Sequence, residues 1–508
     1  MADSRTKNAT RNIASGIVNQ LATILLMFAA RTAILYLLGV NYLGVGTLFS
    51  SVLSFLNLAE LGMASAVVFA MYKPVAEEDY ETLNALVAYY KKIYWTIGFV
   101  ILTMGTVIVP AIPRLIKGEP PAEINVYVLY YIYLVNSVVS YFFQGYKQSI
   151  LFAFQREDIT KNVTTVVKIV FLSIQIVALF LTKSFYVYAF IPIVCTLAIN
   201  AVNAYEVRKH FPRIRPGGKV GEEIKASIRS RLSGLLGTKM YRVVVHQTDI
   251  LVVSAFLGLD MTGIYGNYYY IFNAINGIVI MLFTPLTASI GNKLILDSVE
   301  ESHVLFKRLE YGNAWIVCFC SVCFFCLFEP FVAIWTGEAN CLGQRFAAMM
   351  VGYFFIYQIQ RTVLIFKDAA GIWREDKLRP YTSMVINVVC NLVFVRYFGI
   401  YGVVAATILV FMISMPWANM VLFRTLFRMN PVFNLLLIAK YAVITASACI
   451  LSYGACSFCP SGPLGIILRL LICCIVSTAV FFLPTSRSPE FLFWVSFLKD
   501  NTKKLTGA

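Results

Sequence analysis

The sequence has few charged residues and almost no histidine. Only 13% of its 508 residues are charged and 3 are His, whereas 59% are hydrophobic and the mean hydropathy is +0.74. A soluble domain carries about 25% charged residues. The shortage of charge therefore excludes an ordinary soluble protein and indicates a polytopic membrane protein.

Features that mark enzymes and cofactor sites are also missing. The sequence contains no GxxxxGK[ST] segment, which excludes an ATP-binding loop of that type. Cys456 and Cys459 form a CxxC pair, but without a second pair or a redox fold the motif is a weak signal, and whether the two thiols pair stays open. The longest connection expected on the outer face, 113–125, has roughly a dozen residues, fewer than an independent catalytic domain needs. We therefore expect no catalytic residues, no cofactor and no metal.

Acidic residues are scarce relative to basic ones. The chain has 42 Lys and Arg against 26 Asp and Glu, a net charge of +16. In a membrane protein such an excess collects in the loops on the cytoplasmic face, and it attracts anionic lipids rather than nucleic acid. Most Lys and Arg precede the first apolar segment or follow alternate ones, so we expect both termini in the cytoplasm. The opposite connections hold Arg114, Lys117, Lys183, Arg345 and Arg396.

Long apolar runs are frequent. A transmembrane helix needs roughly 20 mostly apolar residues, and by this criterion the chain has about 14 candidate spans. The sequence thus predicts an all-α integral membrane protein. Two further stretches, 79–92 and 297–311, have an amphipathic pattern that favours interfacial helices, with solvated linkers as the alternative. The candidate spans lie near 12–38, 45–71, 93–112, 126–146, 163–182, 185–205, 232–258, 262–290, 313–335, 344–366, 381–398, 400–425, 437–457 and 464–484.

The longest cytoplasmic connection, 207–231, is rich in Pro, Gly and charge. We therefore expect an N-terminal six-helix lobe over 1–206, this linker, a C-terminal six-helix lobe over 232–426, and two extra helices with a cytoplasmic tail over 427–508. A weak internal repeat supports the division, and its parallel orientation is typical of one class of transporter repeats. The repeat matches Leu38, Gly39 and Gly44 to Leu257, Gly258 and Gly263 at a constant offset.

One apolar stretch, 233–258, carries a stripe of polar groups. Lys239, Arg242, His246 and Asp249 are spaced by three, four and three residues, which places them on one face of a helix. An ionisable group at bilayer depth costs about 2.5–3.5 kcal/mol even on the lenient insertion scale. The stripe must therefore turn away from lipid, either toward a polar cavity in a helix bundle or into structural ion pairs between helices.

Three more ionisable residues fall inside predicted spans. Counting the helical rise from each helix end places Glu60 and Arg361 in the inner half of the membrane, near the level of Lys239 and Arg242. Arg31 lies about two turns below the outer end of the first span. It continues a polar stripe that lines a cavity or packs helices together. That stripe consists of Asn12, Ser15, Asn19 and Thr23.

Segments of the chain resemble the polysaccharide (O-antigen/capsule repeat-unit) flippases of the multidrug/oligosaccharidyl-lipid/polysaccharide exporter superfamily. The segments are the run beginning RTAILYLLGVNYLGVG (31–79), TASIGNK (287–293) and FKDAAGIWREDKLRP (366–380). The resemblance implies two six-helix lobes around a central cavity plus two C-terminal helices. It also implies alternating access, a polyprenyl-linked oligosaccharide as substrate and the bacterial cytoplasmic (inner) membrane as location. A polysaccharide polymerase and chain-length proteins are the protein partners that such a role implies.

The polar residues acquire candidate roles within this expectation. A polyprenyl pyrophosphate has an anionic head, and Arg and Lys donate well to phosphate oxygens. We therefore expect the pyrophosphate to be bound by Arg31, Lys239, Arg242 and Arg361. Asp249, Glu60 and His246 are candidates for coupling through a proton or another ion. Aromatic rings that either stack on sugars or anchor the chain at the membrane interface are Tyr268, Tyr269 and Tyr270.

Other functions stay open on the sequence alone. An ion-coupled multidrug antiporter of the same superfamily is one alternative, although its cavity would favour acidic over basic groups. A membrane-embedded polysaccharide polymerase or glycosyltransferase is another, and it would need a larger outer domain than this chain offers. A non-transporting scaffold of a polysaccharide assembly complex is the third.

Overall fold

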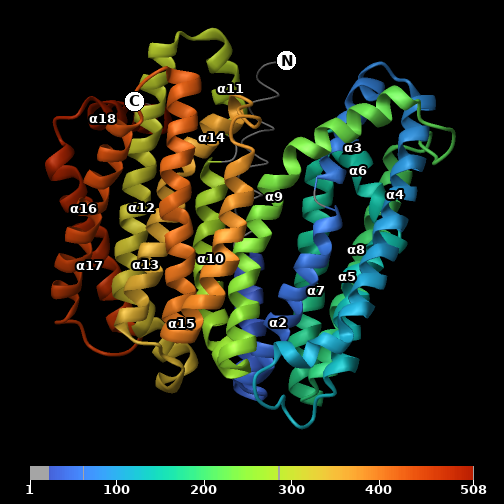
Figure 1. Cartoon of the computed structure of the whole chain (residues 1–508), viewed down its shortest axis with the longest axis horizontal. Coiled ribbons are helices and arrows are strands. Elements are labelled where there is room, and N and C mark those ends of the chain that lie inside the picture. The colour runs from blue at the N-terminus through green and yellow to red at the C-terminus, as the bar shows by residue number, and fades with distance from the viewer. Residues whose placement is uncertain (1–21, 61, 284–285, 507–508) are drawn as a thin grey trace. The chain divides into compact units, whose positions relative to one another are not determined.

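The computed structural model describes residues 22–60, 62–283 and 286–506, and every regular element within these ranges is a helix (Figure 1). Nine of the described helices are long and apolar enough to cross a membrane, or ten if one bent pair counts as a single span. Shorter apolar helices cover Ala22–Leu37, Val40–Leu56 and Met63–Ala76. The all-α, multi-pass architecture is thereby confirmed. The long and the shorter apolar helices together are consistent with the predicted number of about 14 spans.

The chain divides into two compact units, 1–266 and 267–508. The division falls after α9 (Glu222–Leu257), so this helix belongs to the first unit. The helix begins ten residues before the span predicted at 232–258, within the segment expected to be a linker. The lobe limits 1–206, 207–231, 232–426 and 427–508 stay a prediction.

The first unit begins with the helix Ala22–Leu37 and ends in the first turns of α10 (Leu259–Phe283). Within it α7 packs on α8, α5 on α4 and α8, and α9 on α2 and α3. The remaining elements are α2 (Val40–Leu56), η1 (Asn57–Glu60), α3 (Met63–Ala76), α4 (Tyr80–Ile108), η2 (Val109–Leu115), α5 (Val126–Phe142), η3 (Gly145–Lys147), α6 (Gln148–Ala153), α7 (Glu157–Thr182) and α8 (Phe185–His210).

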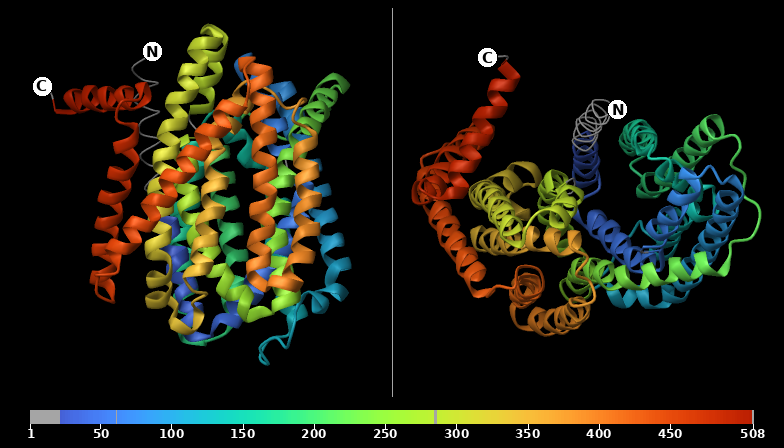
Figure 2. Two further views of the ribbon diagram at one scale, coloured as in Figure 1. Left: turned by 60° about the vertical axis from the view of Figure 1, so that its left-hand side comes forward. Right: turned by 90° about the horizontal axis from the view of Figure 1, so that it is seen from above.

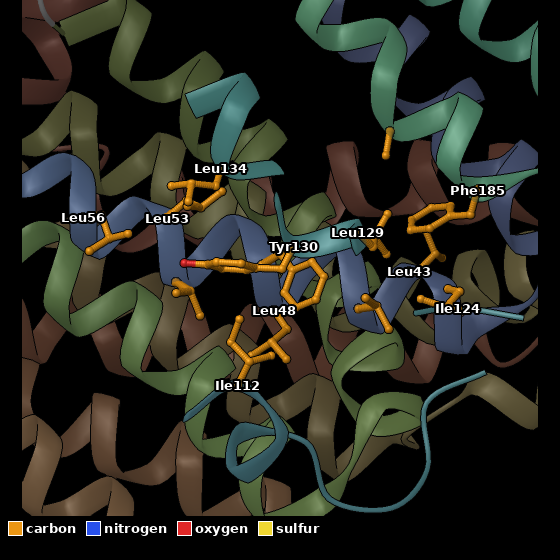
Figure 3. Close-up of a cluster of buried hydrophobic side chains, with 14 of the residues drawn as sticks. Leu43, Leu48, Leu53, Leu56, Ile112, Ile124, Leu129, Tyr130, Leu134 and Phe185 are labelled. Atoms are coloured by element: carbon orange, nitrogen blue, oxygen red, sulfur yellow. The ribbon is translucent and has the colours of Figure 1, made fainter. Parts of the chain in front are cut away.

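Apolar side chains of α2 and α5 form the main core of this unit (Figure 3). Leu48, Leu129 and Leu134 are completely buried there, and the Tyr130 ring meets Phe49 edge to face. The Tyr130 hydroxyl donates to the Gly105 carbonyl oxygen at 3.0 Å, so this buried phenol is satisfied. The core holds α2 in place and thereby fixes the start of η1, the short helix that follows α2 and ends at Glu60.

Two glycines of the predicted repeat meet where α2 crosses the start of α10. A Cβ on Gly44 would lie 2.1 Å from the Leu259 carbonyl oxygen, and a Cβ on Gly263 would lie 2.3 Å from the Val40 carbonyl oxygen. The pairs correspond under the constant offset of the repeat, so each segment makes the same contact with the other. Such reciprocity is typical of a two-fold relation, and the parallel orientation of the repeat stays a prediction.

The second unit is built around α12 (Val299–Thr336), which packs against α13, α16, α17 and α18. In Figure 2 the C-terminal helix α18 (Pro489–Thr506) runs across the direction of α16 and α17, and Trp494 Nε1 donates to the Arg308 carbonyl oxygen at 2.8 Å. The predicted tail thus contains a helix. The other elements are α11 (Leu286–Leu296), η4 (Glu338–Asn340), α13 (Gln344–Ile359), α14 (Arg361–Ala369), α15 (Leu378–Leu422), η5 (Phe423–Phe427), α16 (Val432–Cys456), α17 (Pro463–Phe482) and η6 (Leu483–Thr485).

Helix α15 combines two predicted spans, 381–398 and 400–425. Gly399 within it has φ 56° and ψ −133°, a non-helical conformation that glycine adopts without strain. The backbone therefore turns at the residue that separates the two predicted spans, and the prediction of two spans is confirmed. By contrast, the expected interfacial helices over 79–92 and 297–311 are wrong, because these residues run without interruption into α4 and α12.

Three predicted spans are interrupted rather than continuous within the described residues. Helix α2 ends before η1 and α3, and Gly62 turns the chain there with φ 89°. Helix α5 ends before η3, with a bend of 50° to α6. Helix α13 ends at Ile359 and α14 begins at Arg361. Interrupted helices leave backbone groups and polar side chains where a transporter binds its substrate or ion.

Candidate functional site

The predicted stripe on α9 lies on one continuous helix. Asp249 is buried, with 1% exposure, Lys239 and His246 are half-buried, and Arg242 is exposed. The Lys239 ammonium lies beside Gly62, since a Cβ built on that glycine would be 3.9 Å from Lys239 Nζ. The inner part of the stripe therefore faces the interruption between α2 and α3.

Glu60 lies at that interruption, at the end of η1. The Tyr94 hydroxyl donates to Glu60 Oε1 at 3.0 Å, and the Tyr141 hydroxyl donates to Glu60 Oε2. Tyr94 comes from α4 and Tyr141 from the last turn of α5, so three segments converge on one carboxyl group. Hydrogen bonds to a charged group contribute about 1.5–3 kcal/mol each, and this pair holds the carboxylate in a fixed direction.

Four of the predicted residues share an electrostatic neighbourhood. The charges of Glu60 and Arg242 both act on Lys239, and Arg242 acts in turn on His246. The ion pairs formed within the described ranges include neither Lys239 nor Arg242. Among the described residues, these two side chains therefore do not form the structural ion pairs that the sequence left as the alternative.

Arg31 lies elsewhere in the first unit, at the crossing of α2 and α10. Its Nη2 donates to the Gly263 carbonyl oxygen at 3.3 Å. A Cβ on Gly266 would lie 2.7 Å from the same Nη2, so the missing side chain leaves room for the guanidinium. Of the stripe that leads to Arg31, Asn12, Ser15 and Asn19 lie outside the described residues, and Thr23 lies in the helix Ala22–Leu37.

Arg361 belongs to the second unit and begins α14. Its Nε donates to Gln358 Oε1 at 2.8 Å and its Nη2 to Asn276 Oδ1 at 3.3 Å, while Gln358 Nε2 donates to the same Asn276 oxygen at 2.7 Å. Gln358 is fully buried. These two partners are neutral amides, so they orient the guanidinium without cancelling its charge, and the half-buried group can still attract an anion.

The predicted sugar-stacking role does not fit Tyr268. Its side chain is completely buried. Its hydroxyl donates to Glu329 Oε1 at 2.6 Å and accepts from the Leu342 backbone N–H at 2.9 Å. It therefore connects α10 to α12 and to the segment before α13. Tyr269 stacks on Phe272 of its own helix, and Tyr270 is half-buried.

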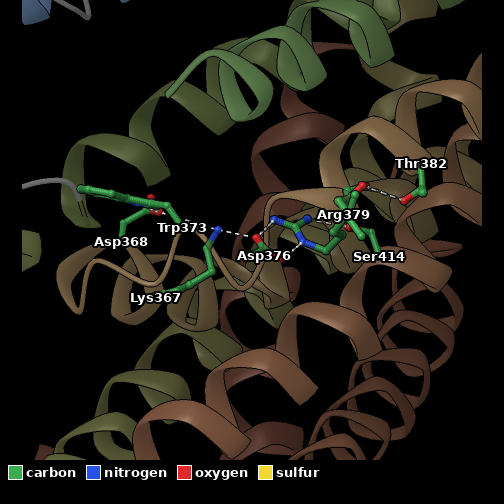
Figure 4. Close-up of polar contacts among 8 residues, drawn as sticks. Lys367, Asp368, Trp373, Asp376, Arg379, Thr382 and Ser414 are labelled. Carbon is green, nitrogen blue, oxygen red and sulfur yellow. Dashed lines mark hydrogen bonds and ion pairs between the residues drawn. The ribbon is translucent and has the colours of Figure 1, made fainter. Parts of the chain in front are cut away.

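Sequence reasoning missed a buried ionic group between α14 and α15 (Figure 4). Lys367 Nζ donates to Asp376 Oδ2 at 2.5 Å, and Arg379 makes two bonds of 2.7 Å to the same carboxylate. Arg379 also donates to Ser414 Oγ at 2.7 Å. Burial tends to raise the pKa of Asp376, but the hydrogen bonds and charges of Arg379 and Lys367 outweigh it and hold that pKa below its ordinary value. The charged residues of the FKDAAGIWREDKLRP segment thus fix the turn behind Arg361.

The cysteine motif also has a different meaning in the structure. Cys456 and Cys459 are both free thiols. The Sγ of Cys456 instead lies within 4.8 Å of those of Cys326 on α12 and Cys473 on α17. Three thiolates at such spacing are a ligand set for soft metal ions. Sequence spacing does not reveal this group, because its members are 130 and 17 positions apart along the chain and meet only where α12, α16 and α17 pack together.

An apolar cavity of about 670 Å³ opens between α12, α13, α15 and α16. Phe325, Val351, Met412 and Ile438 contribute to its lining from these four helices. Its size is within the range of pockets for small ligands, and its walls are apolar.

Solved structures with this fold are described as transporters. An inward closed structure of the lipid II flippase MurJ has a TM-score of 0.65 at 14% identity, over 93% of this chain and 100% of that chain. An inward-facing multidrug resistance MATE family transporter of the MOP superfamily has a TM-score of 0.62 at 15% identity, over 80% and 98%. The MATE transporter VcmN of Vibrio cholerae has a TM-score of 0.52 at 12% identity, over 83% and 100%.

The chain therefore has the fold of the MOP superfamily transporters, the superfamily that its sequence resembles. At these sequence identities the likeness concerns the fold. No protein-family model and no curated protein sequence matches the chain.

Proposed function

We propose that the protein is a flippase that moves a polyprenyl-pyrophosphate-linked oligosaccharide repeat unit across the bacterial cytoplasmic membrane by alternating access, for surface polysaccharide assembly. The observation that carries the proposal is the arrangement of Lys239 and Arg242. Both belong to a membrane helix, and no ion pair within the described ranges includes either. Basic side chains at membrane depth are energetically costly, so we expect that they bind an anion.

Three further features support a lipid-linked pyrophosphate as that anion. The guanidinium of Arg361 is oriented by Gln358 and Asn276, which suits recognition of phosphate oxygens. The apolar cavity beside α16 offers a surface for part of an isoprenoid tail. In addition, a structure described as a lipid II flippase covers 93% of this chain, against 80% for the MATE transporter of similar TM-score.

The remaining predicted residues fit supporting roles. Arg31 would be a further contact for the pyrophosphate. Asp249, Glu60 and His246 would couple transport to a proton or another ion, and an inside-negative potential favours export of negative charge by about 2.3 kcal/mol per charge per 100 mV. The excess of basic residues in alternate connections supports cytoplasmic termini. Protein partners would be a polysaccharide polymerase and chain-length proteins.

The proposal is tested in cells that lack the chromosomal copy of the gene and carry it on a plasmid. We expect cells without the protein to accumulate a cytoplasm-facing lipid-linked oligosaccharide and to lose surface glycan, and wild-type protein to restore it. Arg242→Gln and Arg361→Gln should each reduce restoration at least tenfold, the effect of losing about 1.4 kcal/mol of anion binding. Arg345→Gln, an exposed arginine of α13, is the matched control.

Membrane levels of each variant, measured by immunoblot, separate loss of function from loss of protein. Full surface glycan in both single variants and in the double variant would contradict the proposed anion site. Normal glycan without the gene, together with loss of drug resistance, would instead favour the multidrug antiporter.

A further inference from the structure

A carboxyl group that the sequence did not predict as functional is completely buried in α12. Glu310 has 0% exposure. Its Oε1 accepts a hydrogen bond from Asn434 Nδ2 at 3.2 Å, and the same amide donates to Asn419 Oδ1 at 2.7 Å. Its Oε2 has no hydrogen-bond partner among the residues that the structure describes. The group therefore has one engaged and one vacant oxygen.

No cation balances an ionised Glu310 within the described ranges, since none of the ion pairs there includes it. Its neighbours are the amides of Asn434 and Asn419 and the phenol of Tyr441 on α16. The charge of Glu310 acts on this phenol. An unpaired carboxylate in low-dielectric surroundings is costly enough that it binds a proton instead.

Two basic groups on α12 and α14 are engaged elsewhere. The guanidinium of Arg308 lies over the Phe493 ring of α18, 4.0 Å from its centroid. Lys367 of α14 is paired with Asp376. On α18, Glu490 is a second carboxyl group that acts on Tyr441, so it disfavours a negative charge in this region. From these contacts we infer that Glu310 is a proton-binding group of the second unit.

Buried amides lead from Glu310 toward Arg361. Asn313 lies three residues after Glu310, on the same face of α12. It is completely buried, and its Nδ2 donates to the Gln358 carbonyl oxygen at 3.0 Å, while its Oδ1 lacks a partner among the described residues. The side chain of Gln358 in turn accepts from Arg361 at 2.8 Å and donates to Asn276 at 2.7 Å. Asn313 therefore connects α12, one helical turn from Glu310, to the backbone of the residue whose side chain holds Arg361.

Loss of the proton from Glu310 would change the hydrogen bonds that Asn313 and Asn434 make. A carboxylate only accepts hydrogen bonds, so its two oxygens would compete for amide hydrogens that Asn313 now donates to α13 and Asn434 to Asn419. Redirecting Asn313 would release the Gln358 carbonyl at the junction of α13 and α14, where Arg361 is held. The protonated and ionised forms of Glu310 therefore favour different arrangements of Arg361, which is what coupling of a proton to an anion requires.

The protonation state is tested first, on full-length protein in detergent and without any substrate. Infrared spectroscopy at pH 7 measures the carbonyl stretch of protonated carboxyl groups in wild type, Glu310→Gln and Glu300→Gln. Glu300 is the matched control because it lies on the same helix, is exposed and receives the same substitution. We expect Glu310→Gln alone to lose intensity. Equal spectra of the three proteins would overturn the inference, whatever the protein transports.

The link to Arg361 rests on the proposed function and is tested in proteoliposomes. The probe is a dye-labelled undecaprenyl pyrophosphoryl disaccharide, and its flipping is followed with and without a pH gradient of one unit. We expect the gradient to change the rate by up to about tenfold, the limit for one proton, in wild type and Glu300→Gln, and to have no effect in Glu310→Gln. A retained response in Glu310→Gln would overturn the link. If wild type flips no probe at any pH, the proposed function and the link fail together, while the infrared result still decides the proton site.

Discussion

Replacing Gly44 or Gly263 by Ala tests the reciprocal helix crossing on which the repeat depends. The new Cβ would lie 2.1 Å from the Leu259 carbonyl oxygen in one variant and 2.3 Å from the Val40 carbonyl oxygen in the other. Ordinary contact begins near 3.4 Å, so in close-packed surroundings the two segments must separate by about 1 Å. Overpacking of this kind costs about 1–3 kcal/mol.

Thermal unfolding of the detergent-purified protein measures the effect. One kcal/mol shifts the midpoint of a unit of this size by about 2–4 °C, so we expect each variant to unfold roughly 2–12 °C lower than wild type. Because the same separation relieves both clashes, the double variant should lose less than the sum of the two single losses.

Gly454→Ala in α16 is the matched control, since nothing lies within 4 Å of a Cβ there. Alanine is the better helix former by up to about 1 kcal/mol, so this variant should unfold at the same temperature as wild type or higher. Wild-type midpoints for both Gly44→Ala and Gly263→Ala would refute the close crossing.

Other parts of the structure make separate predictions. Lys367→Met leaves Asp376 and Arg379 with an incomplete buried network, which should cost about 3–5 kcal/mol, whereas Asp368→Asn, at a half-exposed neighbour, should change the unfolding midpoint little. The pKa of Asp376 is lowered in the folded protein, so its carboxylate stabilises the fold above its unfolded pKa of about 3.9, and this contribution is lost as the pH falls through the folded pKa. The difference in midpoint between wild type and Asp376→Asn should therefore shrink in acid; a difference that grows would contradict the assignment. Tyr141→Phe removes one of two hydrogen bonds to Glu60 and should lower stability by about 1.5–3 kcal/mol. Tyr131→Phe, on the same helix and exposed, should have no effect on the midpoint.

The sequence predicted the positions of the membrane spans better than the interruptions within them. Hydropathy located the helices, and the Gly44 and Gly263 repeat pointed to a contact that the structure contains. The stripe of Lys239 to Asp249 is on one helix as its spacing required. Hydropathy does not predict the interruptions, since the 45–71 segment is mostly apolar on both sides of Glu60 and nothing in its hydropathy marks the turn at Gly62.

The buried groups of the second unit show why sequence reasoning stopped short. Glu310 lies in a stretch that looks amphipathic, so it was counted among the residues of a surface helix. Its partner Asn434 is 124 positions away, and neither residue has a neighbour in sequence that reveals the contact. Asp376 and Arg379 are three residues apart, but their partners are Lys367 of α14 and Ser414, which lies beyond the turn of α15 at Gly399.

By itself the sequence determined that this chain crosses a membrane many times through helices and that cations and acids occupy several of those helices. It did so because hydrocarbon tolerates only backbone that satisfies its own hydrogen bonds, and a span of that kind is visible as a run of apolar residues. The tertiary structure alone decided where the helices are interrupted, that Tyr94 and Tyr141 hold Glu60, and that Glu310 is sealed among amides. Those outcomes depend on contacts between segments far apart in the chain, whose energies arise only when the helices pack.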